Sequence, residues 1–306
     1  MSQKNKINGY VDSDSQFVAK YRLKQSEYRK NILKEKKCGV GPKRTSRNHI
    51  GNYLINGEKT GNNFITGTAF IHAKQKVYEK QINSHLTIEE YRLFNNMLSS
   101  MPMCFNLFSD LRQLLVEKKE DCTKVVQRLF SEIDWINEVK YIDIEFIPVP
   151  IEKYINDRTA FDAVIIATDN NDKKGLISIE TKYTDVLGSN VSNSDELNKI
   201  VRRGKLFTVE VQNELFDTGF KQIYRNFLLT YIYAKKNNFK HFANVVISLE
   251  EDKRSLDEIN LLKTQLMKYQ DCIFKINLEE FVDRGKTCLN ETIKNVMTKF
   301  SDRYFV

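Results

Sequence analysis

Three charged side chains interrupt two otherwise apolar segments near the middle of the sequence. Asp162 lies in the segment FDAVIIAT, whereas Glu180 and Lys182 lie in the segment GLISIETKY. Buried charges persist in proteins only when they are paired, hydrogen-bonded or bound to a metal. Side chains two residues apart on a strand point to the same face, so Glu180 and Lys182 should project side by side. These three residues are the first candidates for a site.

A turn between the two segments would bring Asp162 to this pair. The intervening residues, DNNDKK at 169–174, are typical of a tight turn. If the turn is centred near Asn171, positions 162 and 180 are equidistant from it and face each other across an antiparallel hairpin. The spacing therefore predicts that the carboxylates of Asp162 and Glu180 are close enough to share one ion.

The residue types in this cluster indicate a particular chemistry. Two neighbouring carboxylates repel each other, which raises a pKa unless a cation lies between them. A hard divalent ion, Mg²⁺ or Mn²⁺ in its place, suits such oxygen ligands. Lys182 beside the ion would polarise an attacking water or stabilise charge on a phosphate, as phosphodiester hydrolysis requires. The simpler alternative is an exposed salt bridge on a sheet face, but the apolar run after Asp162 favours a strand covered on both faces.

Other mechanisms find little support in the sequence. The five cysteines are scattered and contain no C-x-x-C pair, and no two of the four histidines are spaced as ligands on one helix face. Neither G-x-x-x-x-G-K-[ST] nor G-x-G-x-x-G occurs. A zinc site, a disulfide framework and a glycine-rich nucleotide loop are therefore not indicated.

Periodicity predicts the elements that position these residues. A helix is expected over 15–37 and an irregular loop over 43–67. Several helices should follow over 68–133, one starting at the capping box Thr87-x-x-Glu90 and another after a break at Pro102. Strands are expected at 139–147, 160–168, 175–183, 242–249 and 272–276, and helices at 217–236, 256–269 and 290–300. This order predicts an α/β (α+β) fold with a central mixed β-sheet flanked by helices.

The positive charge of the chain is concentrated near its start. Residues 1–48 hold 13 lysines and arginines against 4 acidic residues, although the whole chain has a net charge of only +8. A basic segment suits a polyanion, because each phosphate that it neutralises releases condensed counterions. The alternative is a solvated helix face followed by a flexible stretch. The candidate nucleic-acid-binding residues are Lys36, Lys37, Lys43, Arg44 and Arg47.

An Asp on one strand followed by Glu-x-Lys on the next resembles the PD-(D/E)XK nuclease superfamily. The matching residues are Asp162 in DRTAFDAVIIA and Glu180-Thr181-Lys182 in GLISIETKYTD. Together with RLFNNMLSSMPMCFNLF, these stretches look similar to a bacterial restriction-endonuclease-like branch. The resemblance covers roughly residues 45–280 and is specific in motif only around 90–185. Phe161 stands where many members have proline, a departure common in a loosely defined motif.

The resemblance implies a restriction-endonuclease-like core and roles for individual residues. Asp162, Glu180 and the Thr181 backbone carbonyl would bind the metal, and Lys182 would be the catalytic lysine. The family often adds an upstream glutamate, for which Glu90 and Glu145 are candidates, each with a structural alternative as a helix cap or an exposed strand residue. On the helix after the hairpin, Gln222 and Arg225 are further candidates, unless they simply form its soluble face.

These expectations combine into one functional hypothesis and one alternative. We expect a basic N-terminal arm at 1–67, a helical region at 68–135 that packs on the core, and a nuclease core at 136–306. Together they would form a Mg²⁺-dependent DNA endonuclease that serves in restriction or antiphage defence. DNA is favoured over RNA, and a homodimer is possible. The alternative is an inactive nuclease fold that binds nucleic acid or a partner protein. Without an apolar span or a signal-like start, a cytoplasmic protein not associated with membranes is expected.

Overall fold

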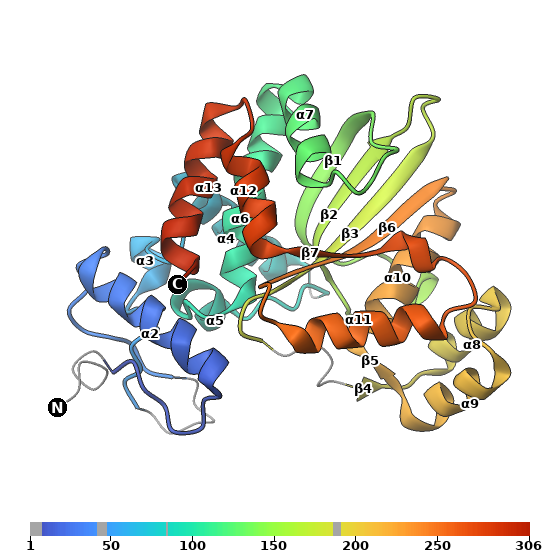
Figure 1. Ribbon diagram of the computed structural model, residues 1–306, viewed down its shortest axis with the longest axis horizontal. Coiled ribbons are helices and arrows are strands. Elements are labelled where there is room, and N and C mark those ends of the chain that lie inside the picture. The colour runs from blue at the N-terminus through green and yellow to red at the C-terminus, as the bar shows by residue number, and fades with distance from the viewer. Residues whose placement is uncertain (1–7, 42–47, 84, 186–190) are drawn as a thin grey trace.

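A mixed five-stranded sheet lies at the centre of the computed structural model, which describes residues 8–41, 48–83, 85–185 and 191–306 (Figure 1). The strand order is β1-β2-β3-β6-β7. The strands are β1 (Glu138–Phe146), β2 (Phe161–Thr168), β3 (Lys174–Lys182), β6 (His241–Ser248) and β7 (Ile273–Asn277). β1, β2 and β3 pair antiparallel, whereas β6 and β7 continue the sheet in parallel with β3. The expected α/β fold class with a mixed sheet is confirmed.

The hairpin of β2 and β3 has the predicted register. Ala163 pairs with Ile179 and Thr168 pairs with Lys174, so the strands are symmetric about residue 171. The turn is held by Asp169, whose Oδ1 accepts hydrogen bonds of 2.8 Å from the backbone N–H groups of both Asn171 and Lys173. A side chain that bonds its own backbone in this way stabilises a tight turn. The turn chemistry and the apolar strands therefore fix which residues face each other.

Helices cover one face of the sheet and share a hydrophobic core with it (Figure 1). They are α4 (Gly67–Ile82), α6 (Ser100–Glu117), α7 (Lys119–Leu129), α12 (Leu278–Lys286) and α13 (Glu291–Tyr304). The sheet contributes alternate residues such as Ile165, Ile177 and Val245 to this core, as the two-residue period of strands requires. The largest helix, α6, packs across β1, β2 and β3.

A second core lies on the opposite face of the sheet, where Val164, Leu176 and Val246 point. It is covered by α8 (Asp195–Gly204), α10 (Gln222–Lys236) and α11 (Lys253–Gln265). Beside them lie α9 (Val209–Thr218) and a two-stranded sheet of β4 (Val191–Ser192) and β5 (Phe220–Lys221). The central strands are thus buried on both faces, which explains why their sequences are almost continuously apolar.

The N-terminal helix α2 (Gln16–Asn31) packs against the C-terminal part of the chain (Figure 1). Buried Gln25 donates hydrogen bonds to the Tyr183 hydroxyl at 3.1 Å and to the Arg303 carbonyl at 3.0 Å. Lys36 and Lys37 are exposed beyond the end of α2, whereas Lys43, Arg44 and Arg47 lie outside the described residues. The division of the chain into three regions stays a prediction. Within the described ranges, no helix has the length and apolar character needed to cross a membrane.

Several predicted helix boundaries are wrong. The first helix ends at Asn31 rather than near residue 37, and the helix predicted over 217–236 is interrupted. Gly219 lies in the left-handed region with φ of +83°, which ends α9, and α10 begins only at Gln222. Helices α8 and α12 were not anticipated, and short helical turns lie at α3 (Gly57–Thr60), η1 (Ile151–Lys153) and η2 (Gln270–Cys272).

The capping box predicted at Thr87 is also wrong. The helix α5 (Glu90–Asn95) is capped by Glu89, whose carboxylate accepts hydrogen bonds from the backbone N–H groups of Tyr91 and Arg92. Pro102 does not break the chain, because it lies in the first turn of α6, after the capping residue Ser99. Proline is tolerated there, since the N–H groups of the first turn have no partner within the helix.

Candidate functional site

A polar cavity of about 450 Å³ opens where β3 ends, between the start of α6 and the start of α10. The cavity brings together most of the side chains proposed from the sequence. They are Glu145, Asp162, Glu180, Lys182, Gln222 and Arg225. The hairpin register places Asp162 next to β3, and α10 supplies the opposite wall. Residues separated by 80 positions in the chain therefore surround one space.

Glu180 and Lys182 form a buried ion pair on this wall. Lys182 Nζ lies 2.7 Å from Glu180 Oε1, and only 4% of the Glu180 side chain and 8% of the Lys182 side chain are exposed. Two amides from α10 hold the carboxylate: Gln222 Nε2 donates to Oε1 and Asn226 Nδ2 donates to Oε2, both at 2.8 Å. Gln222 Oε1 in turn accepts a hydrogen bond from Lys182 Nζ at 3.2 Å. The orientation of Glu180 is thus fixed on both oxygens.

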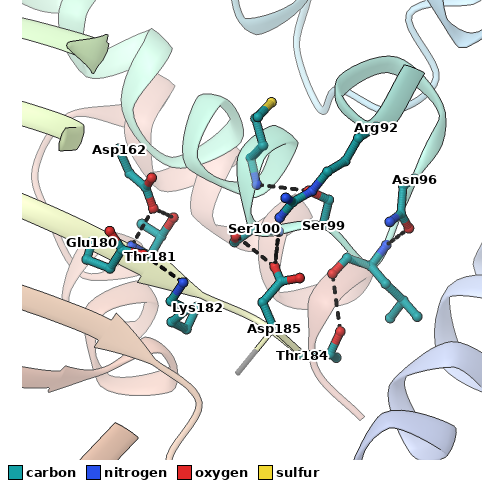
Figure 2. Close-up of polar contacts among 12 residues, drawn as sticks. Arg92, Asn96, Ser99, Ser100, Asp162, Glu180, Thr181, Lys182, Thr184 and Asp185 are labelled. Carbon is teal, nitrogen blue, oxygen red and sulfur yellow. Dashed lines mark hydrogen bonds and ion pairs between the residues drawn. The ribbon is translucent and has the colours of Figure 1, made fainter. Parts of the chain in front are cut away.

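Asp162 is held by the strand next to it (Figure 2). Its Oδ2 accepts a 2.8 Å hydrogen bond from the Thr181 backbone N–H and a 2.9 Å bond from the Thr181 hydroxyl. On the far side, the buried Cys104 thiol donates to the Asp162 carbonyl at 3.3 Å. Asp162 therefore lies next to β3, as predicted. Its contact with that strand is made by Thr181, the residue between Glu180 and Lys182.

Burial and mutual repulsion dominate the electrostatics of the cavity. Burial, followed by the charge of Glu180, raises the pKa of Asp162 to about 7. Burial and the charges of Asp162 and Glu180 raise the pKa of Glu145 to about 8. Burial alone would lower the pKa of Lys182, but the carboxylates of Glu180 and Asp162 raise it above its usual value. The site therefore holds more carboxylates than ammonium groups. The burial of both Glu180 and Lys182 excludes an exposed salt bridge.

Comparison with known proteins agrees with this geometry. A family model described as the PD-(D/E)XK nuclease superfamily matches residues 12–306. The chain belongs to this superfamily. No curated protein and no solved structure gave a significant match. Superfamily membership supports a nuclease type of function, with nucleic acid as the substrate.

PD-(D/E)XK nucleases typically use divalent metal ions, and the cavity is chemically suited to one. In the described part of the chain, no three His, Cys, Asp or Glu side chains are placed to hold a metal together. This does not argue against a hard ion, since Mg²⁺ is commonly bound through one or two carboxylates together with waters and substrate phosphates. Burial is the main cause of the raised pKa of Asp162, and repulsion from Glu180 adds to it. A divalent cation between the two carboxylates would relieve that repulsion. Asp162 and Glu180 fit such an ion.

The accessory candidates from the sequence fall in different places. Glu145 is buried in the cavity rather than on an exposed strand face, with φ of +50°. Glu90 is exposed outside the cavity, 3.6 Å from the ammonium group of Lys80, so it does not join the carboxylates. Arg225 lines the cavity, and its guanidinium lies 4.0 Å from Asp157.

Several polar residues that line the cavity were not among the predicted site residues, and Asn226 and Arg92 are two of them. Asn226 bonds Glu180 directly, and its spacing of four residues from Gln222 on one helix was the signal that it faces the same way. Arg92 reaches the cavity from α5. No feature of the sequence linked Arg92 to the hairpin, because the contact depends on how α5 and α6 pack against the end of β3.

Proposed function

We propose that this protein is a Mg²⁺-dependent DNA endonuclease, with Asp162, Glu180 and Lys182 as its catalytic residues. The observation that carries the proposal is the buried ion pair of Glu180 and Lys182 beside the half-buried carboxylate of Asp162, at the end of a hairpin and facing an open cavity. Such a set is costly to bury unless it binds a cation or reacts with a substrate. Membership of the nuclease superfamily supports the same conclusion.

The residues around the cavity have different proposed roles in metal binding. Asp162, Glu180 and the Thr181 carbonyl would hold the Mg²⁺ ion, for which Mn²⁺ could substitute. The bound ion would lower the pKa of a water molecule and neutralise charge on a phosphate oxygen. Thr181 fixes Asp162 through its N–H and hydroxyl groups. Gln222 and Asn226 fix Glu180.

Lys182 remains charged beside these carboxylates. There it can orient the attacking water by hydrogen bonding and stabilise the negative charge that develops on the phosphate. The buried position also excludes bulk water from the ammonium group, which strengthens its electrostatic effect on a bound phosphate.

Substrate binding is proposed to involve the basic N-terminal segment. Lys36 and Lys37 are exposed and free to approach a phosphate backbone, and Lys43, Arg44 and Arg47 belong to the same basic stretch of sequence. The proposed substrate is DNA rather than RNA. We further propose that the protein forms a homodimer, acts in the cytoplasm and serves in restriction or antiphage defence.

The decisive experiment compares the wild type with Glu180→Ala on supercoiled, linear and modified DNA and on RNA, with Mg²⁺ or Mn²⁺. We expect the wild type to convert supercoiled DNA to nicked and linear forms and the variant to be inactive. Lys182→Met should also lose cleavage but retain binding to DNA. A wild type that cuts none of these substrates over a wide range of protein concentrations would exclude the proposed activity.

The second candidate function is a nuclease fold that binds nucleic acid without cutting it. One observation favours it: Glu180 accepts hydrogen bonds at both oxygens, so a cation must compete with Lys182 and two amides. Under this hypothesis, Glu180→Ala leaves salt-dependent binding unchanged and no metal produces cleavage. The same assays, run with a binding measurement, separate the two functions.

A further inference from the structure

Arg92 lines the cavity, and the proposed mechanism gives it no role. It comes from α5, lines the same cavity as Asp162 and Lys182, and about two fifths of its side chain is exposed. Its charge is felt inside the site, since it lowers the pKa of Glu145 against the larger effect of burial. A guanidinium that faces buried carboxylates without pairing with them is available to a substrate.

Hydrogen bonds to Ser99 and Asp185 fix the orientation of the Arg92 side chain (Figure 2). Its Nε donates a 2.6 Å hydrogen bond to the hydroxyl of Ser99, the capping residue of α6, and its Nη2 donates a 3.2 Å bond to Asp185 Oδ2. Asp185 Oδ2 also accepts bonds from the backbone N–H and the hydroxyl of Ser100, at 3.1 and 2.9 Å. These contacts tie the guanidinium to the first turn of α6 and to the segment that follows β3.

This anchoring leaves part of the guanidinium unused. A guanidinium has five N–H donors in a rigid plane, and among the described residues its hydrogen bonds run from Nε and Nη2 to Ser99 and Asp185, with none from Nη1. Arginine held along one edge presents its other donors in the planar arrangement that matches two oxygens of a phosphate. A purely structural arginine at this junction would need no access to the cavity.

We propose that Arg92 is a substrate-binding residue that holds a phosphate of the nucleic acid beside the scissile bond, and that Asp185 positions it. The inference rests on the proposed nuclease function. Arg92 on α5 and Arg225 on α10 both line the cavity that holds the carboxylates. The sugar-phosphate backbone runs from one arginine to the other across Asp162 and Glu180.

Asp185 lies in the segment that follows β3, three residues after Lys182. Its Oδ2 accepts hydrogen bonds from both Arg92 and Ser100, so it joins the guanidinium to the first turn of α6. Neutralising Asp185 should therefore release the guanidinium of Arg92 from its anchored orientation.

The test measures binding and cleavage separately, in the full-length protein. Fluorescence anisotropy with a labelled duplex in EDTA gives Kd without turnover, over a series of salt concentrations. Arg92→Gln should raise Kd about tenfold and lower the slope of log K against log salt by about one. Arg92→Lys keeps the charge but not the planar fork, so it should retain the slope and raise Kd about threefold.

Steady-state cleavage then identifies the role of each residue. Arg92→Gln should raise KM more than it lowers kcat. Asp185→Ala should resemble it, and the double variant Arg92→Gln/Asp185→Ala should be no worse than Arg92→Gln alone, because the two residues act as a unit. Arg128→Gln is the matched control: Arg128 is an exposed arginine on α7 that also bonds a hydroxyl, that of Thr287, outside this cavity.

The outcomes distinguish the two proposals. If the wild type cleaves DNA but Arg92→Gln matches Arg128→Gln in Kd, salt slope and KM, the assignment of Arg92 is wrong and the nuclease function stands. A lower melting temperature with unchanged Kd and KM likewise assigns Arg92 a structural role only. If the wild type neither binds nor cuts nucleic acid, the proposed function itself fails.

Discussion

Asn226 offers a test of how the cavity is organised. This side chain is only 3% exposed, its Nδ2 donates to Glu180 Oε2 at 2.8 Å, and its Oδ1 has no partner among the described residues. Asn226→Ala removes the donor while keeping a good helix former in α10. The proposed metal ligand Glu180 would then lose its only side-chain partner at Oε2 within the described structure. Its other oxygen would remain bonded to Lys182 and Gln222.

The magnitude follows from the charge of the acceptor. A hydrogen bond to a charged group contributes about 1.5–3 kcal/mol, which corresponds to roughly a ten- to hundredfold change in an equilibrium or rate constant. Loss of groups that orient metal ligands commonly lowers metal affinity or activity by about 10- to 100-fold. We therefore expect Asn226→Ala to reduce cleavage at low Mg²⁺ by about that factor, with partial recovery at high Mg²⁺.

Asn244 provides a matched control on the neighbouring strand. It is also buried, its Nδ2 donates to Ser178 Oγ at 3.0 Å, and its Oδ1 likewise lacks a partner in the described part of the chain. Asn244→Ala removes an equivalent buried amide without touching a carboxylate. Cleavage rates should be measured as a function of Mg²⁺ concentration for both variants, together with urea denaturation. Both should lose stability, but only Asn226→Ala should need more Mg²⁺ for half-maximal rate. Equal metal dependence in the two variants would refute the argument that Asn226 orients Glu180.

Two further predictions concern the fold around the site. Asp143→Ala leaves Lys76, 2.8 Å away, buried without this carboxylate, so urea denaturation should show a loss of about 3 kcal/mol. Burial alone would raise the pKa of Asp143, but hydrogen bonds and neighbouring cations hold it well below its usual value. The wild type should therefore keep this stabilisation above about pH 4 and lose it as the pH falls further. The variant should lack this pH dependence. Gly175→Ala places a Cβ 2.3 Å from the Trp135 ring and should cost about 1–3 kcal/mol, whereas Gly67→Ala, which meets nothing within 4 Å, should leave the melting temperature nearly unchanged.

The sequence was most informative where local chemistry decides the structure. The turn at 169–174 and the apolar strands on either side predicted the hairpin and its register, because an Asx turn and a two-residue period are properties of a few neighbouring residues. The same reasoning placed Glu180 and Lys182 on one face. It did not anticipate that Thr181, which lies between these two residues, would hold Asp162 through its backbone N–H and hydroxyl.

Helix boundaries and long-range contacts were predicted less well. The helix expected from residue 217 is broken at Gly219, and the cap expected at Thr87 is formed by Glu89 instead. Both errors have the same cause: tertiary packing selects among several local conformations of similar energy. The contribution of Arg92 to the cavity depends on the packing of α5 and α6 against β3 and has no signature in sequence spacing.

Glu145 shows how the sheet adds to what the hairpin alone predicts. In the pairing of β1 with β2, Ile144 faces Ala163 and Phe146 faces Phe161, so position 145 lies opposite position 162. The register of β2 with β3 continues this row towards position 180. Three carboxylates thus occupy one row across three antiparallel strands, a relation hidden in the sequence because the long connection between β1 and β2 has no symmetric turn.

This row of carboxylates lowers the stability of the folded protein, and the destabilising features are concentrated at Glu145. A non-glycine residue with φ of +50° adopts a strained backbone conformation, and burial beside Asp162 and Glu180 raises the pKa of Glu145 to about 8. Neither feature stabilises the sheet, since an isoleucine or valine with an ordinary strand conformation would pack better there. A cation bound at the proposed metal ligands would relieve the charge repulsion at Glu145. The position of Glu145 therefore supports the proposed metal site rather than a purely structural role in the sheet.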